Sequence, residues 1–157
     1  EKSSQSASGK VNKSLRNGQL QALIGAVNGM ITDKLKFTTR SGLAILNLAQ
    51  VVEDAFRPAA KMLEQIQKDA QERVGALVDA YGDNKEVDGK VNPDLQKEVD
   101  VINAEFIKKT SEVQDVLVNV EFEPLSDNVF NDERGNPLLL GLDVQHALRP
   151  FIKGYQK

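Results

Sequence analysis

The sequence predicts a mainly α fold of the α+β class: a long kinked helical hairpin with a short N-terminal helix and a small β element plus a C-terminal helix. From residue 41 to residue 81, apolar side chains recur at alternating spacings of four and three, which is typical of a helix seam about ten turns long. A second seam follows after a turn. Only 5% of residues are aromatic and none is Trp, so aliphatic side chains supply the core and favour helix packing.

The N-terminal helix is expected over about residues 18–33. Its apolar positions begin at Leu20, and Asn17 precedes them as the expected cap. The chain opens on Glu1 and not on Met, so residues 1–10 are interpreted as a disordered tail or as a remnant of expression or trimming. Residues 11–157 are expected to form a single helical-hairpin domain.

The long helix is expected to start at Ser41 as its cap and to stop at Gly82. Pro58 lies in the middle, where it lacks a backbone donor and crowds the carbonyl of Asp54. Because the seam keeps its register on both sides of Pro58, we expect one continuous helix that bends there.

The next helix is expected to run back along the long one as an antiparallel hairpin. Asp88-Gly89 is a strong two-residue turn signal, and Asn92 is the expected cap of a helix that starts at Pro93. This helix is about half as long as its partner, so the rest of the seam must pack on another helix or another subunit. The residues expected in this hairpin or oligomer seam are Phe56, Leu63, Ile66 and Leu77.

Residues 116–122 alternate between apolar and mostly polar side chains and predict a half-buried strand. Residues 129–130 and 138–140 are the expected partner strands, because turn-forming residues separate them. Asp143 is expected to cap a short final helix.

The sequence argues against catalytic and metal chemistry. The absence of Cys excludes disulfides, thiolate nucleophiles and cysteine metal sites. The loop from Asn84 to Gly89 imitates a calcium loop, but Leu95 stands where a bidentate Glu is needed. His146 is the only histidine and has no second imidazole for a metal site. We expect a non-enzymatic protein with no cofactor and no metal.

Charge is distributed unevenly along the chain. Residues 1–40 carry a net charge of +5, and residues 41–157 carry −8. A basic segment of this kind contacts nucleic acid, an acidic partner, or the acidic remainder of its own chain or of a second subunit. The residues of this possible basic patch are Lys10, Lys13, Arg16, Lys34, Lys36 and Arg40. No run of 18 apolar residues exists, so a soluble protein without membrane contact is expected.

The order of these features resembles a family of small tailed-bacteriophage proteins that is catalogued only as a domain of unknown function. The resemblance covers about residues 11–153. The features that carry it are Leu15-Arg16-Asn17-Gly18-Gln19-Leu20 followed by Leu23-Ile24, Phe56-Arg57-Pro58, Tyr81-Gly82, the Asp-Gly hairpin, the helix with its Asn-Pro cap, the Val- and Glu-rich strand, and Leu142-Asp143. The chain departs from the family pattern in a longer segment at residues 128–142. The resemblance implies a phage origin and no established catalytic activity, and it transfers no site residues.

The sequence and this resemblance together predict a phage-encoded protein-protein interaction protein in the host cytoplasm or the virion. We expect a virion or assembly accessory component that acts through helical-hairpin packing, with a phage or host protein or a second copy as its partner. The strand at residues 116–122 is a second expected contact, by addition to a partner's sheet. The alternative is a host-directed inhibitor of a host enzyme or defence protein, or a nucleic-acid-associated factor that uses the basic N-terminal segment.

Overall fold

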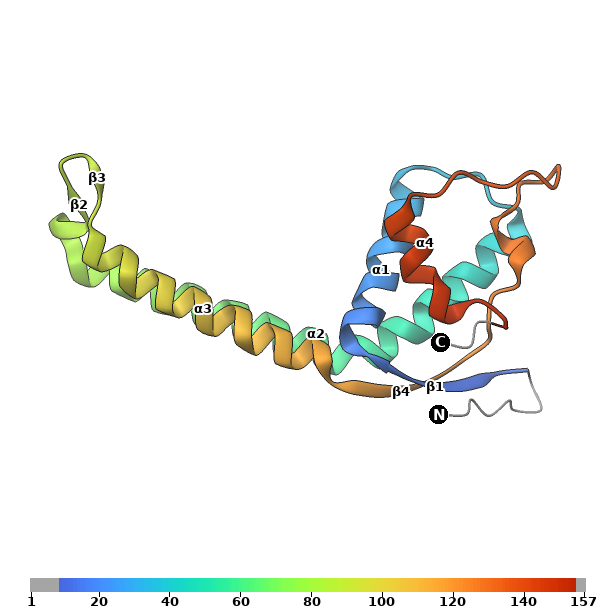
Figure 1. Ribbon diagram of the computed structural model, residues 1–157, viewed down its shortest axis with the longest axis horizontal. Helices are drawn as coiled ribbons and strands as arrows, with labels where there is room; N and C mark the ends of the chain where they lie inside the picture. Colours follow the sequence, from blue (N-terminus) through green and yellow to red (C-terminus); the bar gives the residue numbers. More distant parts are fainter. Residues whose placement is uncertain (1–8, 155–157) are drawn as a thin grey trace. The chain divides into compact units, whose positions relative to one another are not determined.

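The protein is mainly α-helical with two small β elements, and its computed structural model describes residues 9–154 (Figure 1). The strands and α-helices follow in the order β1 (Val11–Arg16), α1 (Asn17–Thr32), α2 (Thr39–Tyr81), β2 (Glu86–Val87), β3 (Lys90–Val91), α3 (Pro93–Asp115), β4 (Leu117–Phe122) and α4 (Leu142–Leu148). Three short 3-10 helices are η1 (Gly82–Lys85), η2 (Asp127–Phe130) and η3 (Arg149–Phe151). The predicted fold class is confirmed.

The expected single domain comprises two compact units. Unit 1 contains residues up to 57 together with those from 116 onward, and unit 2 contains residues 58–115. Helix α2 contributes its first part to unit 1 and its second part to unit 2, and the boundary falls at Pro58, which lies inside the helix as predicted. The predicted tail at residues 1–10 lies mostly outside the described residues.

Unit 1 is built around an antiparallel pair of strands, β1 and β4, with α1, α4 and the first part of α2. The register runs from Val11 opposite Phe122 to Arg16 opposite Leu117. Side chains alternate along β4, with Val120 and Phe122 buried and Asn119 exposed, as a half-buried strand requires. The ring of Phe122 meets that of Phe151 with 5.1 Å between centroids, so the C-terminal η3 segment joins the same core.

The expected strand partner was wrong. Strand β4 pairs with β1, whereas residues 129–130 lie in η2 and residues 138–140 form no named strand. Asn131 and Pro137, at the two ends of the turn that joins these segments, form an isolated antiparallel bridge. Strand β1 pairs with β4 along its whole length, which the short 129–130 segment could not have done.

Three of the expected helix caps were also wrong, each by one to three residues. Helix α1 already includes Asn17, which is buried, and α2 starts at Thr39 because the Thr38 hydroxyl accepts a hydrogen bond of 3.1 Å from the Ser41 amide. Gly141 precedes α4, and Asp143 lies inside its first turn, where a carboxylate is favourable. The cap at Asn92 is confirmed, since its side chain accepts a bond of 2.9 Å from the amide of Asp94.

Unit 2 is a helical hairpin in which residues 58–81 of α2 and the whole of α3 run side by side (Figure 1). Helix α2 ends at Tyr81, and Gly82 follows in a left-handed conformation at φ +53°. The predicted two-residue turn joins β2 to β3, with both Asp88 and Gly89 at positive φ, as such a hairpin turn requires. Within residues 9–154, no helix combines the length and the apolar content that crossing a bilayer demands.

Candidate functional site

Two grooves within the described residues are lined by more than one element. The larger is a groove in unit 1 with a volume of about 820 Å³, and the smaller lies on the hairpin of unit 2 with about 370 Å³. Each groove is formed within one unit.

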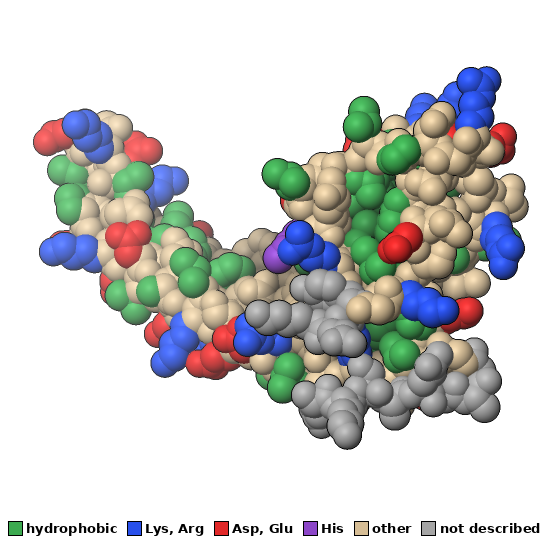
Figure 2. All heavy atoms as spheres, turned by 45° about the vertical axis from the view of Figure 1, so that its right-hand side comes forward, with side chains coloured by type: hydrophobic (Ala, Val, Ile, Leu, Met, Phe, Trp, Pro, Cys, Tyr) green, Lys and Arg blue, Asp and Glu red, His purple; other side chains and the backbone are tan. Residues whose placement is uncertain are grey.

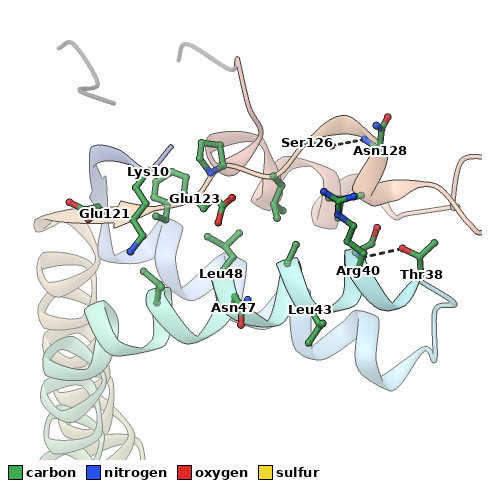
Figure 3. Close-up of a pocket in the computed structure, with 17 residues that line it drawn as sticks. Lys10, Thr38, Arg40, Leu43, Asn47, Leu48, Glu121, Glu123, Ser126 and Asn128 are labelled. Atoms are coloured by element: carbon green, nitrogen blue, oxygen red, sulfur yellow. Dashed lines mark hydrogen bonds between the residues drawn. The ribbon is translucent and has the colours of Figure 1, made fainter. Parts of the chain in front are cut away.

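The unit 1 groove lies between the first part of α2 and the chain from the end of β4 to η2 (Figure 3). Its lining mixes apolar residues such as Leu48, Phe122 and Val129 with charged ones. Lys10 lies near Glu121 and Glu123 at one end, and Arg40 lies near Asn128 at the other (Figure 3). The two hydrogen bonds drawn there, to the hydroxyls of Thr38 and Ser126, hold backbone turns in place.

The structure distributes the residues of the predicted basic patch and does not gather them at one place. Lys10 and Arg40 line the groove together with carboxylates. Lys13 is half-buried in β1, its ammonium donates a hydrogen bond of 2.8 Å to the carbonyl of Pro150, and burial lowers its pKa. Arg16, Lys34 and Lys36 are exposed at the end of β1 and in the α1–α2 link. In Figure 2, Lys and Arg side chains are likewise spread over the visible face among acidic ones.

The predicted seam residues fall into both units. Phe56 precedes Pro58 and is buried in unit 1, with 8% of its surface exposed. Leu63, Ile66 and Leu77 lie in unit 2 and are half-buried. Ile66 lines the hairpin groove beside Ile102 and Phe106 of α3, so the seam does face α3 at this point.

Two polar contacts hold the hairpin helices together across this groove and near the tip. The Arg73 guanidinium donates a hydrogen bond of 2.5 Å to the Glu105 carboxylate, and the Tyr81 hydroxyl donates one of 2.7 Å to Glu98. The hydrogen bond from Arg73 lowers the pKa of Glu105, and the bond to Glu98 raises the pKa of Tyr81. Both pairs join a residue of α2 to a residue of α3 and so indicate the axial alignment of the two helices.

The remaining predicted candidates for chemistry do not assemble into a site. His146 is exposed in the last turn of α4, and the calcium-like loop forms the β2–β3 turn. Among residues 9–154, no group of three or more His, Cys, Asp or Glu side chains is placed to hold a metal ion.

Reasoning from the sequence did not find the unit 1 groove, because its two walls are about 80 residues apart in the chain. The sequence does contain one sign of the groove, an apolar stripe on α2 made of Leu43, Leu48 and Val51. All three residues line the groove, and Leu43 is 57% exposed. Comparisons with known proteins add no homologue: no family model, curated protein or solved structure matches this chain.

Proposed function

We propose that this chain is a non-enzymatic, phage-encoded interaction protein, a virion or assembly accessory component whose α2–α3 hairpin packs against a protein partner. The phage context comes from the family resemblance, and the hairpin assignment comes from the burial of its side chains.

The observation that carries the proposal is the small core of unit 2. Within residues 58–115, the buried apolar residues are Ala59, Leu95, Ile102 and Val113. A helix pair without a third layer leaves one side of each helix uncovered, and stable domains close such sides against another element.

The apolar side chains left outside this core support the same proposal. Met62, Val101 and Ile107 are each more than half exposed, and the seam residues Leu63 and Leu77 are only half-buried. Aliphatic groups that remain in contact with water favour association, because burying them gains about 25 cal/mol per Å².

The basic segment gives no comparable support to the nucleic-acid alternative. Its residues are distributed over unit 1, and Lys10 lies beside Glu121 and Glu123 in the groove; a phosphate backbone is repelled by such carboxylates.

Capture from phage-infected host lysate tests the proposal, with the purified full chain as bait, moderate salt and nuclease treatment. Mass spectrometry of the captured proteins is expected to show phage particle or assembly proteins. Recovery of a single host enzyme or defence protein would contradict the proposal and make the chain an inhibitor.

Matched bait variants test the role of the hairpin. The double variant Val101→Ser/Ile107→Ser is expected to lose at least ten-fold of the captured phage protein. The control Leu139→Ser/Leu142→Ser removes equally large and even more exposed side chains from unit 1 and is expected to capture as much as the unmodified chain. Loss with the control alone would contradict the hairpin assignment.

A further inference from the structure

Strand β4 is paired along one of its two edges. Within the described residues its one strand neighbour is β1. The amide of Asn17 donates a hydrogen bond of 3.0 Å to the carbonyl of Val116, and these two residues continue the register of the strands. Bonded and non-bonded pairs alternate along an antiparallel ladder, so Val118, Val120 and Phe122 are the residues of β4 that bond to β1.

The residues between them direct their backbone groups to the other edge of β4. The N–H and C=O groups of Leu117, Asn119 and Glu121 point away from β1. Among residues 9–154, no backbone carbonyl accepts a hydrogen bond from any of these three amides. We call this side of β4 the free edge. It offers donors and acceptors to a further strand.

The unit 1 groove runs along the free edge. Successive side chains of a strand point to opposite faces of its sheet, yet the consecutive residues Glu121, Phe122 and Glu123 all line the groove. A hollow over one face would be lined by every second residue. The groove therefore lies at an edge of β4, and because β1 occupies one edge, it lies at the other. Helix α2 forms the opposite wall (Figure 3).

We propose that the groove binds an extended segment of a partner protein, which adds to the free edge of β4 as a third strand of the sheet. This inference goes beyond the hairpin contact proposed above and does not depend on it. In this mode of recognition, hydrogen bonds to the main chain supply the affinity, and the surroundings of alternate side chains supply the specificity.

The carboxylates of the groove define one face of the bound segment. Glu121 and Glu123 are exposed and two residues apart, so their side chains lie on the same face of the sheet. Lys10 lies beside them (Figure 3), and two carboxylates against one ammonium leave this end of the groove with a formal charge of −1. Residues directly opposite each other on neighbouring strands interact. The segment is therefore expected to carry Lys or Arg opposite Glu121 and Glu123.

The other face of the segment is expected to be apolar. The position opposite Phe122 lies between the two basic positions and shares the face on which Phe122 is buried. Leu48 and Val51 of α2 line the groove, and Val51 still has 37% of its surface exposed. Arg40 lies at the other end of the groove (Figure 3), which favours an acidic residue at that end of the segment. The expected core pattern is basic, apolar, basic.

Selection from a displayed library of short random peptides tests this pattern, with the purified full chain as bait. Peptides that carry Lys or Arg on both sides of an apolar residue are expected to be enriched. The double variant Glu121→Lys/Glu123→Lys is expected to enrich Asp or Glu at these two positions instead.

Two results of the selection would overturn the inference. The first is no enrichment with the unmodified chain, which is expected if the two glutamates only protect the edge from pairing. The second is enrichment of the same basic residues by the unmodified chain and by the double variant.

The most enriched peptide, made synthetically, is the probe for two matched proline variants. Glu121→Pro removes an N–H from the free edge of β4, and Asn12→Pro removes one from the outer edge of β1 at the position directly opposite. Neither change removes a hydrogen bond between β1 and β4. Glu121→Pro is expected to raise the dissociation constant of the probe at least ten-fold, and Asn12→Pro less than two-fold. Equal weakening by the two variants would overturn the inference.

Amide hydrogen exchange of the unmodified chain, resolved by residue, does not depend on the variants folding. A saturating amount of the same probe is expected to slow exchange at Asn119 and Glu121 at least ten-fold. Exchange at Val118 and Val120 is expected to change much less, because their amides already bond to β1. A bound probe that leaves Asn119 and Glu121 unchanged, or that slows all four amides equally, would overturn the inference.

Discussion

Lys34 has a left-handed backbone conformation that is unfavourable for a residue with a side chain. It follows α1 at φ +53°, and its amide and that of Leu35 bond the carbonyls of Ile31 and Met30 at 3.1 and 3.3 Å. This is the helix ending in which glycine is preferred, because a Cβ in the left-handed region is crowded by the next carbonyl.

Lys34→Gly is therefore expected to stabilise unit 1 by about 0.5 to 1 kcal/mol, measured as a higher midpoint of urea unfolding. Lys36→Gly is the control, since Lys36 lies two residues further along at negative φ and glycine there only adds freedom to the unfolded chain. A midpoint that falls for Lys34→Gly as it does for Lys36→Gly would contradict this explanation.

Glu105 links the stability of the hairpin to pH. The hydrogen bond from Arg73 holds the pKa of Glu105 below its ordinary value of 4.5. A carboxylate with a depressed pKa in the folded state contributes stability above its unfolded pKa and loses it as the pH falls through the folded value. Glu105→Gln is thus expected to lower the melting temperature at neutral pH and to have no effect in acid well below pH 4.5. A deficit of equal size at both pH values would show that the pair contributes nothing through its charge.

Among the elements, α2 contains the one proline placed against helix geometry. Pro58 lies inside α2 and is exposed, whereas Pro93 occupies the first position of α3. An interior proline lacks the backbone N–H that would donate a hydrogen bond to the carbonyl of Asp54. At the first position of a helix, the backbone N–H has no partner within the helix, so a proline there removes no hydrogen bond.

Pro58→Ala is expected to raise the free energy of unfolding by about 1 to 3 kcal/mol, and the same substitution at Pro93 is expected to be neutral or slightly destabilising. Denaturant unfolding followed by circular dichroism measures both. Equal effects of the two substitutions would show that α2 has adapted its backbone to Pro58.

The helices and β4 could be predicted from the sequence because their signals are local, while the pairing of β4 could not. The alternation that marks β4 lies within six residues, but its partner β1 is about 105 positions away, as the hydrogen bond from Ser14 to Asn119 illustrates. Strand β1 also alternates, yet Lys13 occupies a half-buried position in it, so the segment looked like part of a basic cluster. Three caps were missed because Asn17 is buried inside α1, because Thr38 and not Ser41 accepts the first-turn amide of α2, and because Gly141 precedes α4 two residues before Asp143.

For the candidate surfaces too, the local part could be predicted from the sequence and the pairing of distant segments could not. The seam residues Leu63, Ile66 and Leu77 could be predicted from helical spacing, and they lie half-buried in the hairpin. The spacing of one helix does not show which flank joins which flank of its partner. That information comes from the antiparallel arrangement of α2 and α3, and the pair of Arg73 and Glu105 shows which residues of the two helices lie at the same level.

For the whole molecule, the two units differ in the size of their buried apolar cores. Unit 1 encloses rings such as Phe122 and Phe151, which are at most 1% exposed. Unit 2 leaves Ile107 and Val101 mostly in contact with water. Unit 1 also leaves apolar residues exposed, such as Leu139 and Leu142, so the difference between the units lies in the size of the buried core, and the proposed role of the hairpin rests on that difference.

The most direct test is hydrogen exchange of the full chain, alone and with a phage protein that it captures. Because binding stabilises the bound state by mass action, protection of the amides in α3 is expected to increase when the captured protein is added, while protection of the amides that join β1 to β4 stays constant. Protection in α3 that is unchanged by the captured protein, and is already equal to that of the unit 1 core in the chain alone, would contradict the account.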